Sequence, residues 1–383
     1  MTDLFPGLAP AVRRTLDGFP RLIDQAFPLP RRFRAGLPQD VAELSRLLTS
    51  GRGERRDSYL GTPNMLSAYL RYFLPWNVYR LCRLLPALPL HFAPGDAIID
   101  LGSGPLTLVI SLWIGRPDLR ELPLEFRCVD RTAAALDAGK RLFYTLAGDA
   151  PPWVIKPIRA SLGDPLYGPK ARLVSAVNVF NEVFGALPRH TAALQQAADK
   201  TSRLLSSLTA ASGSILALEP GIPRSGECIA ALRAALLEQG QVPCSPCPHR
   251  GTCPCPGGKA KWCHFAFDTE DAPAALHTLS AAAGLPKERA TLSFLLTGPG
   301  EPESPQEHEK TLLARIFSDP FPVPGRGYGR YGCSSRGLIL ALDRDRRNEK
   351  NKSGALVSLT LGSPEKRDPK TGALLAEFIP SAV

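Results

Sequence analysis

Apolar side chains recur at helical spacing through the first ninety residues. Between residues 8 and 48, Leu, Phe and Val return every three to four positions, which predicts amphipathic helices interrupted at the prolines. A second run of this kind extends from Met65 to Leu85 and predicts two helices that meet at Pro75. Its aromatic residues are more typical of a packed core than of a base-stacking surface. We therefore expect an N-terminal helical region over residues 1–90.

The pattern changes at Ala97 to a short apolar strand and a glycine turn. The turn reads Asp100-Leu101-Gly102-Ser103-Gly104-Pro105, and the apolar run 106–114 would begin a helix. Glycine is needed where the backbone bends sharply and approaches a ligand. A second strand, 124–130, ends in Asp130, whose carboxylate can accept both ribose hydroxyls of a nucleoside. Together these features predict a nucleotide-binding α/β unit, with a glycine turn in an ordinary α/β protein as the alternative.

Strands and helices keep alternating as far as residue 239. We expect strands at 153–158, 172–180 and 214–218 with helices between and after them. Five strand–helix units in order predict a doubly wound parallel sheet. Ligands of such sheets lie beyond the carboxyl ends of the strands, where the sequence places Asp100, Gly102, Asp130, Asn181 and Glu219. Asn181 and Glu182 are either polar site residues or the cap of the next helix.

The last strands follow a cysteine-rich interruption. We expect the apolar runs 290–297 and 337–342 to complete the core sheet. Residues 326–336 are rich in glycine, arginine and tyrosine, a composition that suits contact with a nucleic-acid backbone as well as a tight turn. After a solvated linker over 343–353, two short apolar runs could form a terminal hairpin. We therefore expect five regions along the chain. They are the N-terminal helices (1–90), the core of the sheet (91–240), the cysteine-rich insertion (241–270), the last core strands with Cys333 (271–345), and the linker with the terminal hairpin (346–383).

Composition and charge narrow the class of protein. Apolar residues make up 44% and charged residues 21% of the chain, as in soluble globular proteins. No apolar run is long enough to cross a membrane, and the first residues do not resemble a signal peptide. We therefore expect a cytoplasmic protein without membrane association. The net charge of +10 gathers in residues 1–90 and 325–352, which favours a nucleic-acid partner over a merely solvated surface.

Five of the nine cysteines lie between residues 244 and 263. Thiolates gathered on a stretch rich in proline and glycine indicate a soft-metal site, and Cys333 is a candidate to join them in space. A disulfide knot is the alternative, although it requires an oxidising compartment. Four cysteine thiolates would suit a structural zinc ion as well as an iron–sulfur cluster.

These motifs resemble the methyltransferase-like assembly factors of the small ribosomal subunit, which are found in mitochondria and bacteria. The likeness covers roughly residues 60–375. Its most specific part is the cysteine block. The matching motifs are Asp100 to Pro105, Asn181-Glu182, Glu219-Pro220-Gly221, Cys247-Pro248-His249, Cys253-Pro254, Trp262-Cys263-His264-Phe265 and Arg330-Tyr331-Gly332-Cys333.

The resemblance implies a class I S-adenosylmethionine (SAM) fold, a Rossmann-like sheet with N-terminal helices and a metal-binding insertion. It implies a [4Fe–4S] cluster on Cys247, Cys253, Cys263 and Cys333, and small-subunit rRNA of a pre-ribosome as partner of a monomeric chain. The cofactor-binding residues would be Asp100, Gly102, Ser103, Gly104, Asp130, Asn181 and Glu219, and the catalytic ones Asn181 and Glu182. Leu106 stands where the family pattern has a third glycine.

Two functions fit these expectations. The first is an rRNA methyltransferase that holds its nucleophile in line with the sulfonium of SAM. The second is an assembly factor that keeps the fold and works by binding rRNA. A radical SAM enzyme is disfavoured because its compact C-x3-C-x2-C motif does not occur in the sequence.

Overall fold

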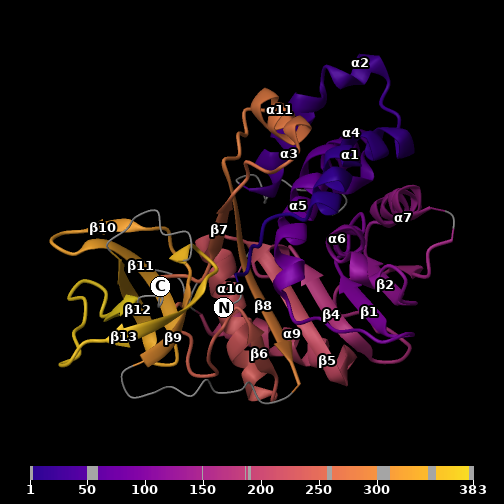
Figure 1. Ribbon diagram of the computed structural model, residues 1–383. Helices are drawn as coiled ribbons and strands as arrows, with labels where there is room; N and C mark the ends of the chain where they lie inside the picture. The colour runs from indigo at the N-terminus through magenta and orange to yellow at the C-terminus, as the bar shows by residue number, and fades with distance from the viewer. Residues whose placement is uncertain are drawn as a thin grey trace.

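The computed structural model describes residues 3–49, 59–148, 150–185, 187–188, 191–256, 261–299, 311–343 and 351–378. Helices of the N-terminal region lie above a large sheet, and a second, smaller sheet lies beside it (Figure 1). Every helix within these ranges is too short or too polar to cross a membrane.

The N-terminal region is helical, as predicted. Its helices are α1 (Pro10–Ala26), α2 (Arg31–Arg34), α3 (Leu37–Leu48), α4 (Pro63–Ala68) and α5 (Leu74–Leu84), with a π-helical turn η3 (Tyr69–Phe73) before α5 and 3-10 turns η2 (Tyr59–Gly61) and η4 (Leu85–Ala87). The expected break at Pro20 is wrong, because α1 continues through it. Phe19 and Ile23 are buried on either side of Pro20, and their packing holds the helix together.

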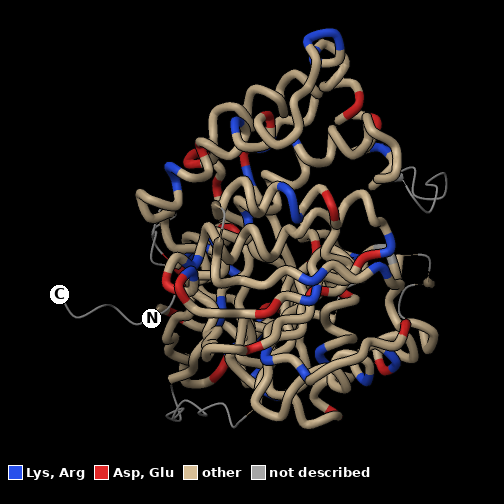
Figure 2. The backbone as a smooth tube through the Cα atoms, turned by 90° about the vertical axis from the view of Figure 1, so that its right-hand side faces the viewer, with Lys and Arg blue, Asp and Glu red and all other residues tan. Residues whose placement is uncertain are grey.

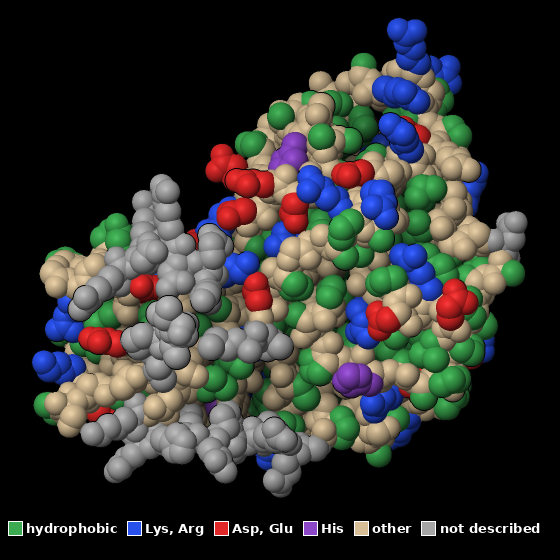
Figure 3. Space-filling view, viewed as in Figure 1, with side chains coloured by type: hydrophobic (Ala, Val, Ile, Leu, Met, Phe, Trp, Pro, Cys, Tyr) green, Lys and Arg blue, Asp and Glu red, His purple; other side chains and the backbone are tan. Residues whose placement is uncertain are grey.

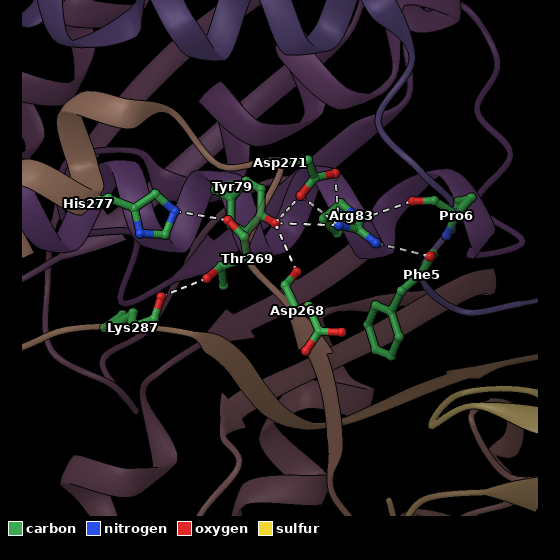
Figure 4. A network of polar contacts seen from close by, with 9 residues as sticks. All are labelled: Phe5, Pro6, Tyr79, Arg83, Asp268, Thr269, Asp271, His277 and Lys287. Atoms are coloured by element: carbon green, nitrogen blue, oxygen red, sulfur yellow. Dashed lines mark hydrogen bonds and ion pairs between the residues drawn. The ribbon is translucent and has the colours of Figure 1, made fainter. Parts of the chain in front are cut away.

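A polar network fixes the N-terminal segment to this region (Figure 4). Arg83 on α5 donates to the carbonyls of Phe5 and Pro6 at 3.3 and 3.0 Å. Its guanidinium also pairs with Asp271 at 2.9 Å, and Asp271 accepts a hydrogen bond from Tyr79. Because Asp271 lies just before helix α11 (Ala274–Ala282), the network joins the start of the chain to a segment nearly 270 residues later.

The core sheet has the strand order β3-β2-β1-β4-β5-β8-β6, with β7 also paired to β8. The first five run parallel. β8 runs antiparallel to β5, so the sheet is mixed rather than wholly parallel as expected. The strands are β1 (Ala97–Leu101), β2 (Glu125–Asp130), β3 (Val154–Arg159), β4 (Ala171–Val177), β5 (Thr209–Pro220), β6 (Val242–Ser245), β7 (Phe265–Asp268) and β8 (Arg289–Gly298).

Helices cover both faces of this sheet, as a doubly wound fold requires. Ile98 on β1 packs in the cluster that includes α5, α6 (Thr107–Gly115) and α7 (Ala133–Ala147). Its neighbour Ile99 packs on the opposite side with α9 (Ala192–Leu208) and α10 (Pro223–Glu238). Successive strand residues point to opposite faces, so the continuous apolar runs of the sequence serve two cores.

The second sheet takes all six remaining strands. They are β9 (Thr311–Ile316), β10 (Phe321–Val323), β11 (Gly327–Ser334), β12 (Gly337–Asp343), β13 (Leu356–Leu361) and β14 (Leu374–Phe378), in the order β10-β11-β12-β14-β13-β9. β9 also pairs with β11, which closes β9, β11, β12, β14 and β13 into a ring. We call residues 311–378 the C-terminal barrel.

The barrel corrects two expectations and confirms a third, the C-terminal hairpin. Residues 337–342 do not complete the core sheet, because β12 pairs with β11 and β14. The predicted hairpin of 355–361 and 373–378 exists as the antiparallel pair β13 and β14, but inside the barrel. Residues 326–336 are largely strand β11, and Arg330 is buried in an ion pair with Asp343 at 3.0 Å, so its side chain does not face a nucleic acid.

Candidate functional site

A pocket opens at the carboxyl ends of β1, β2, β3 and β4, where a doubly wound sheet binds its ligands. The N-terminal region adds Leu60 and Tyr69 to one wall. The remaining lining residues are Leu101, Gly102, Gly104, Val129, Asp130, Arg131, Thr132, Ala160, Ser161, Leu162, Val177, Asn178, Val179 and Val183. Of the residues expected to bind a cofactor, the structure brings Gly102, Gly104 and Asp130 together here.

Two glycines shape the turn that follows β1. Gly102 has φ +65° and Gly104 has φ +51°, a left-handed conformation that costs most other residues about 1–2 kcal/mol. A Cβ on Gly102 would lie 2.5 Å from Cγ2 of Val179, so the turn also needs glycine for space. Gly104 has open space where its Cβ would be, which leaves its backbone accessible from the pocket.

Leu106 adopts the left-handed conformation that a third glycine would have taken, with φ +59°. Its side chain is fully buried and does not line the pocket. It packs against α7 instead, where a Cβ on Gly139 would lie 2.6 Å from its Cγ. Leu106 in place of a third glycine therefore does not fill the pocket. Gly139, which has no side chain, leaves space on α7 for the Leu106 side chain.

Asp130 ties the end of β2 to this turn. Its carboxylate accepts the backbone N–H of Gly104 at 2.9 Å and of Thr132 at 2.8 Å. Ser103, another predicted cofactor residue, is buried and donates to the carbonyl of Val129. Ser103 thus stabilises the glycine turn from the buried side, whereas Asp130 lines the pocket.

Asp100 is the penultimate residue of β1; its side chain is buried and does not line the pocket. Its Oδ1 accepts a hydrogen bond from Ser175 at 2.7 Å, and its Oδ2 has no partner among the described residues. Burial raises the pKa of Asp100 to about 7. The side chain of Asp100, predicted to bind cofactor, therefore lies outside the pocket lining.

Asn178, not Asn181, lines the cavity at the end of β4. It has φ +61°, a conformation that asparagine tolerates better than most residues. Its Oδ1 accepts a hydrogen bond at 2.9 Å from Arg80, a buried residue of α5. Arg80 also donates to Asn77 at 3.0 Å and to the carbonyl of Thr291 at 3.1 Å. The sequence reasoning identified neither Asn178 nor Arg80.

Glu219 supports the site from below. Its carboxylate accepts the backbone N–H of Phe180 at 2.7 Å and of Asn181 at 3.1 Å, at the start of the short helix α8 (Phe180–Val183). Burial raises the pKa of Glu219, while these N–H groups and Arg80 favour the charged form. Asn181 is the second residue of α8 and does not line the pocket, and the side chain of Glu182 lies outside the described part of the structure.

Five cysteines surround a second, apolar cavity between the core and the barrel. The four cysteines predicted as metal ligands, Cys247, Cys253, Cys263 and Cys333, all line it, and Cys255 joins them. Cys244 is exposed and lies outside the lining. All nine cysteines are free thiols, so the disulfide alternative gains no support. In the ranges that the structure describes, no group of three or more His, Cys, Asp or Glu side chains is placed to hold a single metal ion.

Positive and hydrogen-bonding groups approach these sulfurs. Arg233 on α10 donates to Sγ of Cys247 at 3.3 Å and to the carbonyl of His249 at 2.9 Å. Nε2 of His249 lies 3.0 Å from Sγ of Cys333. Burial and the neighbouring thiols raise the pKa of Cys263, so thiolates here require compensating positive charge. Arg233 supplies part of that charge.

Comparison with known proteins finds a family model that matches part of the chain. Residues 190–321 match the family model Rsm22, described as mitochondrial small ribosomal subunit Rsm22. The match runs from α9 through the cysteine stretch to the start of β10, about a third of the chain. It confirms the predicted resemblance to a ribosomal small-subunit family. No curated protein matches the sequence significantly.

Solved structures similar to the chain include methyltransferases. Magnesium protoporphyrin IX methyltransferase from Synechocystis PCC 6803 with bound SAM has 12% identity and a TM-score of 0.36, covering 68% of this chain and 97% of that one. A SAM-dependent methyltransferase from Geobacter sulfurreducens with S-adenosylhomocysteine has 13% identity and a TM-score of 0.34, covering 67% and 98%. The fold is a class I methyltransferase-like mixed sheet with N-terminal helices.

Proposed function

Taking the Rsm22 match as premise, we propose that this chain is a SAM-binding, methyltransferase-like protein that acts on small-subunit rRNA during ribosome assembly. The observation that carries the proposal is the pocket at the carboxyl ends of β1, β2 and β4, with the backbone of Gly104 accessible from the cavity. Class I folds bind nucleosides at this edge because the strand ends and glycine turns converge there.

The residues of the pocket fit an adenosine cofactor. A carboxylate offers about four acceptor positions, and Asp130 uses two of them for the N–H groups of Gly104 and Thr132. The others remain for ribose hydroxyls. Asn178 would place its amide near the reacting end of the cofactor. When bound, SAM would supply a methyl group and leave as S-adenosylhomocysteine.

One observation favours the second candidate, a binding factor without catalysis. Methylation of an amine or hydroxyl requires a group that takes up its proton. Asp130 is the only acidic residue in the described pocket lining, and two backbone N–H groups already engage it. The predicted catalytic residue Asn181 lies outside that lining. An assembly factor that binds the cofactor and rRNA needs no such base.

The thiols that line the cysteine cavity are of the type that binds an iron–sulfur cluster or zinc, and we propose a metal centre here. Cys247, Cys253, Cys263 and Cys333 would be the ligands of a [4Fe–4S] cluster, with Cys255 as a fifth thiol in the same cavity. Arg233 and His249 would donate hydrogen bonds to ligand sulfurs, and the guanidinium of Arg233 would offset part of the negative charge of the thiolates. Zinc remains the alternative, and anaerobic purification separates the two by iron and acid-labile sulfide content.

The RNA partner is supported by a basic tip on the N-terminal region. Arg31, Arg32 and Arg34 are all exposed on α2, and Phe33 between them has 53% of its surface exposed. Figure 2 colours the backbone of basic residues blue at the upper end of the molecule, and Figure 3 shows basic side chains there, where Figure 1 labels α2. Arginines around an exposed aromatic suit phosphates and a stacked base.

Calorimetric titration with S-adenosylhomocysteine tests the pocket. We expect the wild type to bind and Asp130→Ala to bind about tenfold or more weakly, because the variant loses the ribose acceptor and frees the glycine turn. Asp118→Ala is the matched control, since Asp118 forms an ion pair with Arg116 on the surface, away from the pocket. A wild-type protein that fails to bind would contradict the cofactor assignment.

Incubation with methyl-labelled SAM and RNA from small subunits separates the two candidate functions. Label in the RNA that is lost with Asp130→Ala supports the methyltransferase. RNA binding without label transfer supports the assembly factor.

A further inference from the structure

The C-terminal barrel has a definite connectivity. Its five closing strands, taken in chain order as first to fifth, are β9, β11, β12, β13 and β14. Around the ring they follow the order first, second, third, fifth, fourth and back to first. β12 and β14 are parallel and the other neighbours are antiparallel. The interior is filled by small and branched apolar residues, including Leu312, Ile339, Val357 and Leu374.

This connectivity is that of the OB-fold, a five-stranded Greek-key barrel whose members bind oligonucleotides and oligosaccharides. OB-folds hold their ligand on the outer face of the second and third strands and on the loops that flank it. In this chain those strands are β11 and β12. Neither the apolar runs of the sequence nor the family match identifies the barrel, because the match ends at residue 321.

The outer face of β11 and β12 is not available here. Tyr331 is only 9% exposed and Leu340 only 3%, and both belong to the core cluster shared with the rest of the molecule. Cys333 on the same face lines the cysteine cavity. The loops at the ends of the barrel are therefore left to contact a ligand.

One pair of loops gathers basic side chains. Strand pairing puts the β11–β12 turn and the β13–β14 loop at the same end of the barrel, and Arg336 of the turn pairs with Glu365 of the loop at 2.7 Å. Arg336, Lys366, Arg367 and Lys370 are all exposed. Glu365 is engaged by Arg336, and Asp368 accepts hydrogen bonds from Thr371. We call these four basic residues the barrel loop patch.

We infer that the C-terminal barrel is a single-stranded RNA-binding module that uses the barrel loop patch. The inference rests on the proposed function, since it names a part of the chain that contacts the RNA. No large apolar side chain is exposed on the described part of the barrel, which argues against insertion into a membrane or an apolar docking surface. Four exposed cations on an oligonucleotide-binding topology fit a phosphate backbone.

The test measures binding of the full-length chain to a labelled single-stranded oligoribonucleotide of about 12 nucleotides, within the range of OB-fold sites. The variant is Lys366→Glu/Arg367→Glu/Lys370→Glu. We expect affinity to fall at least tenfold, and the slope of log affinity against log salt to fall by about 2, at roughly 0.7 per lost phosphate contact. S-adenosylhomocysteine binding should be unchanged, which shows that the variant is folded.

The charge-matched control is Lys170→Glu/Lys200→Glu/Arg203→Glu, which reverses three exposed charges on the core. Weakening confined to the barrel variant supports the inference. Equal weakening by the control, or none by the barrel variant, overturns it. Equal competition by duplex RNA of the same length overturns the single-strand preference. A wild-type chain that binds no RNA overturns the proposed rRNA function as well. If the wild type binds RNA and the barrel variant binds it equally well, only the role of the barrel is overturned.

Discussion

Single residues determine which side chains line the pocket, and Arg80 is one of them. Its guanidinium reaches from α5 to Asn178 and holds this left-handed residue at the cavity. The sequence predicted a strand through residue 180 and placed the polar site at Asn181. The strand ends at Val177, so the residue that faces the pocket comes three positions earlier. Periodicity locates a strand, but its last residue depends on contacts such as Arg80, which lies about 100 residues away.

Replacing Arg80 with Met should weaken S-adenosylhomocysteine binding about tenfold, because Asn178 loses its partner. Arg83→Met is the matched control. Arg83 lies one helical turn away and is also buried, but it bonds to Asp271 and the N-terminal segment (Figure 4). The control should lower the melting temperature and leave affinity intact. Calorimetry with thermal unfolding measures both.

If Arg80→Met and Arg83→Met lose the same affinity for S-adenosylhomocysteine, the contact between Arg80 and Asn178 has no specific role, and α5 affects the pocket only through the stability of the fold. If Arg80→Met does not fold, Asn178→Asp and Asn178→Ala carry the same comparison. Asp keeps an acceptor for Arg80 and should bind the cofactor better than Ala.

At the scale of elements, the sequence predicted most strands and helices of the core, because apolar runs, glycine turns and helical spacing are local signals. It did not predict how elements fit one another. Leu106 and Gly139 are 33 residues apart, and only the packing of α7 on the β1–α6 turn shows that they form a pair. The assignment of 337–342 to the wrong sheet has the same cause, since a short apolar strand does not specify its neighbours.

Gly139→Ala should lower the free energy of unfolding by about 1–3 kcal/mol, the usual cost of overpacking. The new Cβ would lie 2.4 Å from the carbonyl carbon of Pro105, and backbone there has little room to move. Gly18→Ala in α1 is the control. Its Cβ would meet no atom within 4 Å, so the gain in helix propensity should stabilise the protein by about 0.5–1 kcal/mol. Urea unfolding compares the two, and equal effects would contradict the packing described for α7.

At the scale of the whole molecule, the cysteine cavity lies between the insertion and the C-terminal barrel, which are far apart in the sequence. Cys247, Cys253 and Cys263 come from the insertion, and Cys333 comes from the barrel rather than from the last strands of the core, where the sequence placed it. Arg315 of β9 adds a hydrogen bond across the boundary to the carbonyl of Pro246 at 3.1 Å. The clustering of cysteines is visible in the sequence itself. The barrel topology could not, since it depends on pairings between strands far apart in the chain.

If the proposed metal centre holds the barrel against the core, Cys263→Ser should lower the metal content and weaken RNA binding at the same time. Cys244→Ser is the control, since Cys244 lies outside the cavity lining and its loss should leave metal content unchanged. Metal and sulfide analysis and RNA affinity are measured on the same preparations. RNA affinity that survives loss of the metal would rule out this structural role.

The position of Cys333 on β11 has a consequence for biosynthesis. It follows Cys263 by about 70 residues, so a growing chain presents the earlier thiols well before the last one emerges from the ribosome. A chain that stops early, or whose final strands do not close, keeps an open set of sulfurs exposed to oxidation. Metal content would then report whether translation and folding of the C-terminal end had reached completion.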